Sequence, residues 1–203
     1  MWSCESKQGS VISMLKRLAI VALLQIALGS ALSVRVFAQA SPLAPKASEI
    51  DQNVTAALRE LYLQNEAAKD LGVKAKAVLV FPDIKKAAFI VGAQYGYGAL
   101  RKGASTVGYY RTGAASYGLQ AGVKKFGYAL FFMTDSALTY LDKSGGWAIG
   151  TGPSIVVVDQ GAARSLTTTN LRSDVYAFVF SQQGLMGGIG LEGSKITKIT
   201  PSE

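Results

Sequence analysis

The chain of 203 residues contains no histidine and a single cysteine, and its 21 Lys and Arg against 13 Asp and Glu give a net charge of +8. The commonest general base and the commonest metal ligand are therefore absent, and one thiol cannot build a disulfide within the chain or a thiolate metal site. We expect a protein that is not an enzyme and that uses no cofactor and no metal. The positive charge favours anionic partners such as lipid headgroups or nucleic acid.

Residues 1–40 have the pattern of a secretory signal peptide. Lys16 and Arg17 precede an apolar run over 18–32, and Ala38-Gln39-Ala40 supplies the small-x-small pattern of a cleavage site. The run is shorter than the roughly 20 apolar residues that span a membrane. We expect cleavage after residue 40 and export to the periplasm, with or without association with the outer membrane; an uncleaved anchor is the alternative. An exported basic protein meets lipid headgroups far more often than nucleic acid.

A short flexible arm over 41–47 and one helix are expected next, at the start of a single domain that spans 48–203. Ser48 is the predicted N-cap of the helix, and Gly72 its stop. The apolar residues between them recur at helical spacing: Ile50, Val54, Ala57, Leu58, Leu61, Ala68 and Leu71. The polar face mixes acidic and basic residues, so we expect the helix to close over a sheet, on the face of that sheet that is rich in glycine.

The pattern changes to that of β-strands at residue 76. The apolar run 77–81 predicts a strand buried on both sides, and Pro82-Asp83 is expected to end it. Further strands are predicted over 86–100, 106–111, 114–123 and 126–133, with turns at 101–103, 112–113 and 124–125. Such tight and evenly spaced turns favour antiparallel neighbours.

A short helix capped by Thr134 and stopped by Gly145 is predicted in the middle of the chain. Three segments follow it: 147–158, which should bend at its glycines and Pro153, then 174–181, and 185–199. The predicted fold is therefore α+β. It combines a mostly antiparallel sheet of about seven or eight strands, a size at which a sheet can curl, with an N-terminal helix and a short mid-chain helix.

Glycine recurs at alternate positions of several predicted strands. In the stretch FIVGAQYGYGAL (89–100), the three residues Tyr95, Tyr97 and Ala99 face one way and the glycines face the other. Glycine weakens a strand, so a face paved with it implies close approach by another backbone or by a ligand. Either a helix packs tightly there, or the face is a shallow apolar groove that accepts a lipid chain. The candidate glycines are Gly96, Gly98, Gly118, Gly122, Gly188 and Gly190.

Basic residues gather near the predicted turns and strand starts, where we expect them to share one rim that holds lipid headgroups. A basic residue near an anionic surface contributes about 1 kcal/mol, so several must act together. The candidates are Lys74, Lys76, Lys85, Lys86, Arg101, Lys102, Lys124 and Lys125.

Motifs for nucleotide binding and catalysis do not hold up. The run 188–193 matches G-x-G-x-x-G, but the helix and the acidic residue that a dinucleotide site needs after it are missing. A site of paired carboxylates would have to come from aspartates at the ends of predicted elements, where turn or cap roles are the ordinary explanation. These are Asp83, Asp135, Asp142, Asp159 and Asp174.

Five blocks stand out in order along the chain. They are VFP (80–82), followed by Lys86 and F-x-x-G-x-x-x-G-x-G-x-L (89–100); YGLQAG (117–122); FFM-x-D-x-AL (131–138); Gly152-Pro153; and GLM-x-G-x-GL-x-GSKI (184–196). Together they resemble the SYLF lipid-binding domain family, in its bacterial exported branch, over roughly residues 48–201. The resemblance implies a phospholipid-binding module. Eukaryotic relatives bind phosphoinositides, and some contact actin through further segments.

The resemblance therefore implies a non-enzymatic periplasmic protein that associates peripherally with membranes through the basic rim and the glycine face. Its expected partners are phospholipid headgroups, acyl chains and the membrane surface, and not nucleic acid. Tyr109-Tyr110-Arg111 stands where eukaryotic relatives carry a Trp-containing stretch, and the N-terminal helix lacks a dense basic face. Neither phosphoinositide specificity nor actin binding is therefore predicted. The alternative function is a structural or interaction protein of the cell envelope with no bound ligand.

Overall fold

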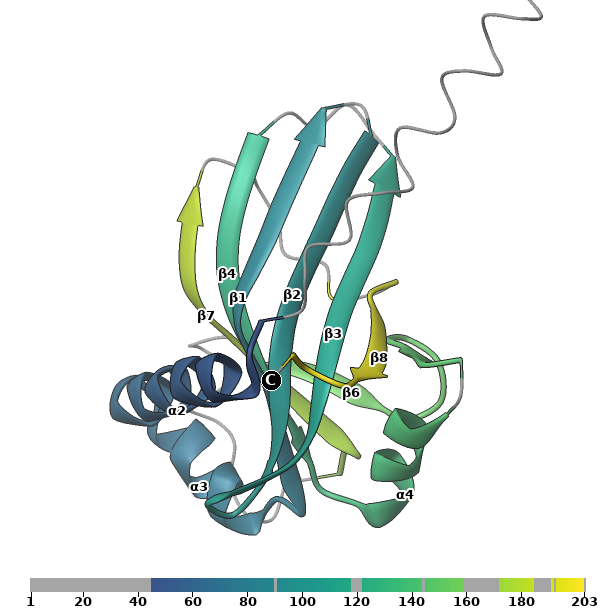
Figure 1. Cartoon of the computed structure of the whole chain (residues 1–203). Coiled ribbons are helices and arrows are strands. Elements are labelled where there is room, and N and C mark those ends of the chain that lie inside the picture. Colours follow the sequence, from purple (N-terminus) through teal and green to yellow (C-terminus); the bar gives the residue numbers. More distant parts are fainter. Residues whose placement is uncertain are drawn as a thin grey trace, which may run out of the picture. The chain divides into compact units, whose positions relative to one another are not determined.

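The structure is a computed structural model, and it describes residues 45–89, 91–117, 122–143, 145–158, 172–184, 191 and 193–202. The predicted α+β fold is confirmed (Figure 1). The helices are α2 (Ala47–Gln64), α3 (Glu66–Lys74), α4 (Asp135–Leu138) and the 3-10 turn η2 (Thr139–Asp142). The strands are β1 (Ala77–Phe89), β2 (Val91–Lys102), β3 (Ser105–Tyr117), β4 (Gly122–Phe132), β5 (Trp147–Ala148), β6 (Ile155–Val158), β7 (Val175–Gly184) and β8 (Lys195–Ile199).

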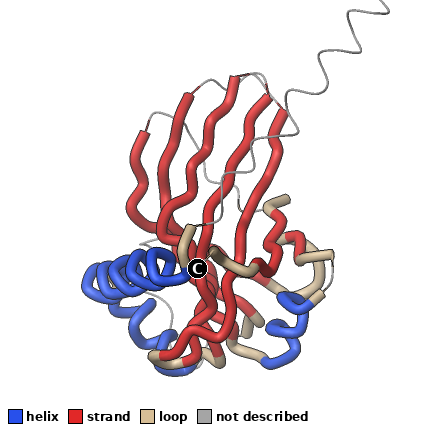
Figure 2. The backbone as a smooth tube through the Cα atoms, viewed as in Figure 1, coloured by secondary structure: helices blue, strands red, loops and turns tan. Residues whose placement is uncertain are grey.

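Within the described residues these strands form one curled, mostly antiparallel sheet in the order β5-β8-β3-β2-β1-β4-β7-β6. The pair β6 and β7 is parallel, and the other neighbours are antiparallel. The predicted bend in 147–158 is real, because this segment supplies two short strands that lie at opposite edges of the sheet. The tube in Figure 2 shows the long central strands extending past the helices.

Each face of the sheet carries its own core. Val78 and Val80 of β1 face α2 and α3, whereas Leu79 and Phe81 face α4, η2 and Trp147. Side chains alternate along a strand, so a strand buried on both sides must be apolar at every position. This requirement explains the continuous apolar runs that mark β1, β4 and β7 in the sequence. It also places helices against both faces of the lower sheet (Figure 1).

The strand β1 does not end at Pro82, which corrects the prediction. The pairing of β1 shifts register between Val80 and Asp83 toward β2, and between Phe81 and Ile84 toward β4, and the strand then continues to Phe89. Proline has no N–H for the ladder and is tolerated at such a bulge. The bulge changes which face each later residue of β1 occupies.

The turns predicted at 112–113 and 124–125 are also wrong. Gly113 lies inside β3 opposite Tyr95, and Lys125 lies inside β4 opposite Lys85. Both segments have partner strands on two sides, and this pairing overrides the local turn preference. The sheet is therefore built from longer strands than the turn residues indicated.

The single N-terminal helix that was predicted is two helices. The backbone of Asn65 is extended, and its side-chain oxygen accepts a hydrogen bond of 3.0 Å from the N–H of Ala68, so Asn65 caps α3. Gly72 lies inside α3, which ends at Lys74. The N-cap of α2 is Lys46 rather than Ser48. The cap predicted for Thr134 is confirmed, because its hydroxyl accepts a hydrogen bond from the N–H of Ala137.

The helices α2 and α3 cover the face of the sheet opposite to Gly96 and Gly98, which corrects the expected placement. A Cβ at Gly98 would overlap the carbonyl oxygen of Val80, and one at Gly96 would overlap the side chain of Ile84. The close approach that these glycines permit is therefore made by β1 itself, beside its bulge. Side-chain alternation decides this, since Ala99 faces α2 and its neighbours in β2 face away.

None of the described helices is both long enough and apolar enough to cross a membrane. The predicted signal peptide, the first residues of the arm (41–44), Gly118, Gly188, Gly190 and Asp159 lie outside the described residues.

Candidate functional site

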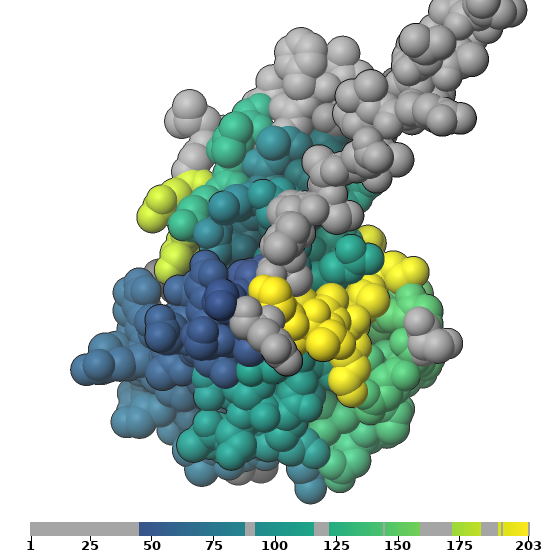
Figure 3. Space-filling model, in the orientation of Figure 1, coloured from purple at the N-terminus to yellow at the C-terminus, as the bar shows by residue number. Residues whose placement is uncertain are grey.

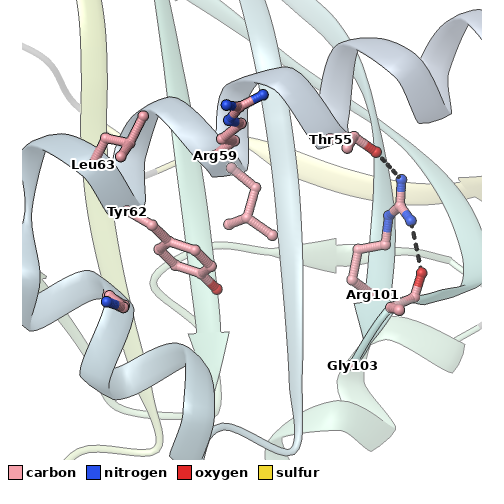
Figure 4. Close-up of a pocket in the computed structure, with 9 residues that line it drawn as sticks. Thr55, Arg59, Tyr62, Leu63, Arg101 and Gly103 are labelled. Atoms are coloured by element: carbon pink, nitrogen blue, oxygen red, sulfur yellow. Dashed lines mark hydrogen bonds between the residues drawn. The ribbon is translucent and has the colours of Figure 1, made fainter.

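A pocket with a volume of about 420 Å³ lies between α2, α3 and the turn that joins β2 to β3 (Figure 4). Ligand pockets in proteins span about 300–1,000 Å³, so this one is at the small end of that range. In the space-filling view the blue surface of α2 and α3 adjoins teal surface of the segment around residues 91–117 (Figure 3). Its lining residues are Thr55, Leu58, Arg59, Tyr62, Leu63, Lys69, Arg101, Gly103 and Ala104.

The helix α2 supplies the apolar wall of the pocket. Leu58 and Tyr62 are one turn apart and partly buried, and both pack against the core beneath the helices. Leu63 is 78% exposed, although it is one of the residues that line the pocket. Removing an apolar side chain from water is favourable, and Leu63 gains little of that benefit in the described part of the chain.

Tyr62 is held between the two helices by its contact with Gly72 of α3. A Cβ at Gly72 would overlap the phenol oxygen of Tyr62. The ring also lies 6.4 Å, centroid to centroid, from Phe131 of the core. Burial raises the pKa of the Tyr62 hydroxyl above its ordinary value. Glycine at position 72 thus leaves room for the Tyr62 ring, which projects from α2 and lines the pocket (Figure 4).

Arg101 fastens the β2–β3 turn to α2. Its guanidinium donates hydrogen bonds of 2.7 Å to the hydroxyl of Thr55 and 3.0 Å to the carbonyl of Ala104 (Figure 4). It also donates to the carbonyl of Asp51 and lies 3.6 Å from the carboxylate of that residue. Its Nε–H is buried and has no acceptor among the described residues. Arg101 therefore sets the position of one side of the pocket.

The carboxylate of Asp51 completes this fastening. It accepts hydrogen bonds of 2.7 Å from Thr106 and 2.9 Å from Tyr109, both in β3. Burial, and then the hydrogen bond and the charge of Asp51, raise the pKa of the Tyr109 hydroxyl. We call Asp51, Arg101, Thr106 and Tyr109 the Asp51 clamp. It fixes the first half of α2 on the sheet and so fixes the pocket wall that follows.

The polar edge of the pocket is basic. Arg59 and Lys69 are exposed, and neither side chain has a hydrogen-bond or ion-pair partner in the part of the chain that the structure describes. No acidic side chain is among the residues that line the pocket. An apolar wall beside two uncommitted positive charges is complementary to a molecule that has an apolar part and an anionic end.

Most of the basic residues predicted to form one rim lie elsewhere, and only Arg101 lines the pocket. Lys85 and Lys125 are opposite each other on the face of the sheet that carries α2 and α3, and Lys125 lies 3.1 Å from Asp83. Lys86 and Lys124 are opposite each other on the other face, with Lys124 only 6% exposed. Consecutive lysines in a strand point to opposite faces, so the eight residues do not share one rim.

The remaining predicted residues lie at both ends of the sheet and do not cluster. Lys74 ends α3, and Lys76 follows it and forms an exposed ion pair of 3.6 Å with Asp135. Lys102 is exposed beside the β2–β3 turn. Gly122 begins β4 and pairs with Ala88.

The predicted aspartates serve structural roles where they are described. Asp83, Asp135 and Asp142 each form an ion pair with a lysine. Asp174 accepts hydrogen bonds from the backbone and hydroxyl of Ser154 and from Thr134, and these bonds lower the pKa of its carboxyl. The described residues contain no group of three or more His, Cys, Asp and Glu that could hold a metal ion.

The sequence prediction missed Arg59, Tyr62, Leu63 and Lys69. Leu58 was recognised only as part of the buried stripe of the helix. A usable signal was present, because Leu63 falls outside the apolar stripe and has Arg59 one turn before it. In the structure this leucine adds exposed apolar surface to α2 beside Arg59.

Comparison with known proteins finds a family model that matches the C-terminal part of this chain. Residues 113–201 match the family model Ysc84, described as Las17-binding protein actin regulator. Over residues 113–201 this match confirms the SYLF family resemblance drawn from the sequence motifs. The matched segment contains β4, α4, β7 and β8, whereas the pocket is lined by residues between 55 and 104. No curated protein matches the chain.

Proposed function

We propose that this protein is a non-enzymatic phospholipid-binding protein that attaches peripherally to membranes through the surface around the α2–α3 pocket. The observation that carries the proposal is the combination of an apolar pocket wall with Arg59 and Lys69 at its edge. Two exposed apolar side chains, Leu63 at 78% and Val73 at 84%, lie on the same pair of helices. Apolar side chains flanked by basic residues are the pattern of a surface that enters the headgroup region of a bilayer.

The expected affinity is modest. Arg59, Lys69 and Lys102 contribute about 1 kcal/mol each near an anionic membrane. Burying Leu63 among lipid chains adds roughly 1.5–3 kcal/mol. The sum of about 5 kcal/mol corresponds to a dissociation constant on the order of 0.1 mM, so attachment is reversible. The predicted signal peptide makes the periplasm the proposed compartment, with residues 48–203 as the lipid-binding domain.

Vesicle flotation tests this proposal. We expect the purified protein to float with vesicles that contain phosphatidylglycerol and to remain behind with pure phosphatidylcholine, and we expect salt to weaken binding. Arg59→Glu and Leu63→Asp should each reduce recovery. The matched control is Lys195→Glu, an exposed lysine on β8 that does not line the pocket. Equal recovery with both kinds of vesicle, unchanged in the two pocket variants, would count against the proposal.

The description of the matched family, which names an actin regulator that binds Las17, favours a second candidate. In this alternative the protein is a structural or interaction protein of the cell envelope and holds no lipid. Native mass spectrometry followed by lipid extraction separates the two. A lipid that co-purifies supports the first function, whereas a lipid-free protein that also fails to float supports the second.

A further inference from the structure

We infer that the α2–α3 pocket takes up one molecule of a single-chain anionic amphiphile, of which a fatty acid is the simplest member. This inference rests on the proposed function, because it names the ligand of the same surface. It goes further in placing one lipid molecule in the protein, where the proposed function requires only that the protein rests on a bilayer. The alkyl chain of the ligand would lie along Leu58, Tyr62 and Leu63, and its anionic end beside Arg59 and Lys69.

The first argument is that two basic side chains at the pocket, Arg59 and Lys69, have no acidic partner among the described residues. Several other lysines are engaged: Lys76, Lys125 and Lys198 with aspartates, and Lys143 with the ring of Tyr140 at 3.5 Å. Arg59 and Lys69 have no such partner among the described residues, and they come from different helices to one pocket. A carboxylate or phosphate oxygen between them would form charge-assisted hydrogen bonds.

The second argument is size. The pocket volume of about 420 Å³ is at the low end for ligand sites, and the ring of Tyr62 closes its inner end against Gly72. One alkyl chain fits this space better than the two chains of a phospholipid. The alkyl chain of the ligand would cover the exposed side chain of Leu63, and this contact would remove apolar surface of both the ligand and the protein from water.

Isothermal titration calorimetry with dodecanoate at submicellar concentration tests the inference on the full chain. We expect one molecule bound per chain, and binding of the uncharged methyl ester weaker by roughly tenfold, the loss expected for one charge-assisted hydrogen bond. In Arg59→Gln/Lys69→Gln the acid and the ester should bind equally. Lys195→Gln, outside the pocket, should retain the preference for the acid.

A second variant tests the apolar half of the site. Gly72→Ala displaces the ring of Tyr62 toward the pocket and should weaken binding of the acid and the ester alike by several-fold, with folding verified by circular dichroism. No binding, several molecules per chain, or a preference for the acid that survives the double substitution would overturn the inference. Flotation of the same proteins separates the two proposals. Vesicle binding without uptake of dodecanoate leaves the proposed function standing, and loss of both overturns both.

Discussion

Replacing Asp51 by alanine should loosen α2 from the sheet and lower the stability of the fold. The carboxylate accepts hydrogen bonds from Thr106 and Tyr109 and pairs with Arg101, whereas the backbone carbonyl of residue 51 keeps its own bonds in the variant. A hydrogen bond to a charged group contributes roughly 1.5–3 kcal/mol. The side chain of Asp51 is 35% exposed, so solvent screens part of its ion pair with Arg101.

We therefore expect Asp51→Ala to cost about 2–4 kcal/mol. For a chain of this size that loss lowers the midpoint of thermal unfolding by about 5–12 °C. Circular dichroism at neutral pH measures it. Asp70→Ala is the matched control, because it removes the same charge from an exposed position on α3 that has no side-chain partner among the described residues. If the two variants melt together, the Asp51 clamp does not hold α2 and the reasoning is wrong.

Three further predictions follow from packing and protonation. Gly98→Ala should cost about 1–3 kcal/mol in urea unfolding, because its Cβ meets the backbone of Val80, whereas Gly145→Ala, where the space is open, should be tolerated. Hydrogen bonds lower the pKa of Asp174 in the folded protein, so the stability that its carboxylate contributes is present above the ordinary pKa range of aspartate and is lost as the pH falls below that range. In Asp174→Asn the stability should therefore fall less steeply at acid pH. Burial raises the pKa of the Tyr128 hydroxyl, so the stability that this tyrosine contributes is complete below pH ~10 and is lost at higher pH. Tyr128→Phe should therefore unfold less readily in alkali. A variant that unfolds in alkali like the parent would exclude this tyrosine as the cause.

The sheet was predictable from the sequence because its strands are buried on both faces. A strand in that position must be apolar at successive residues, and the runs 77–81 and 174–181 show this without ambiguity. The cap at Thr134 and the interruption near Gly150 were equally local, since each depends on a few neighbouring residues.

The pocket was not predictable in the same way. It depends on the break at Asn65, which brings Lys69 and Gly72 of α3 beside Arg59 and Tyr62 of α2. No periodic pattern encodes that approach. The shared basic rim was not predictable for a different reason. Lys124 and Lys125 look like turn residues, but their pairing with β1 and β7 places them inside a strand. Because side chains alternate along a strand, these two lysines point to opposite faces of the sheet.

The fluorescence of Trp147 reports on the face of the sheet opposite to the pocket. Its indole is 1% exposed, donates a hydrogen bond of 2.8 Å to the carbonyl of Thr151 and lies 5.9 Å, centroid to centroid, from the ring of Phe132. The sheet stands between this indole and the helices α2 and α3. Loosening of the face of the sheet that carries α4 therefore changes the fluorescence emission of Trp147. A change confined to the junction of α2 and α3 leaves that emission unaltered.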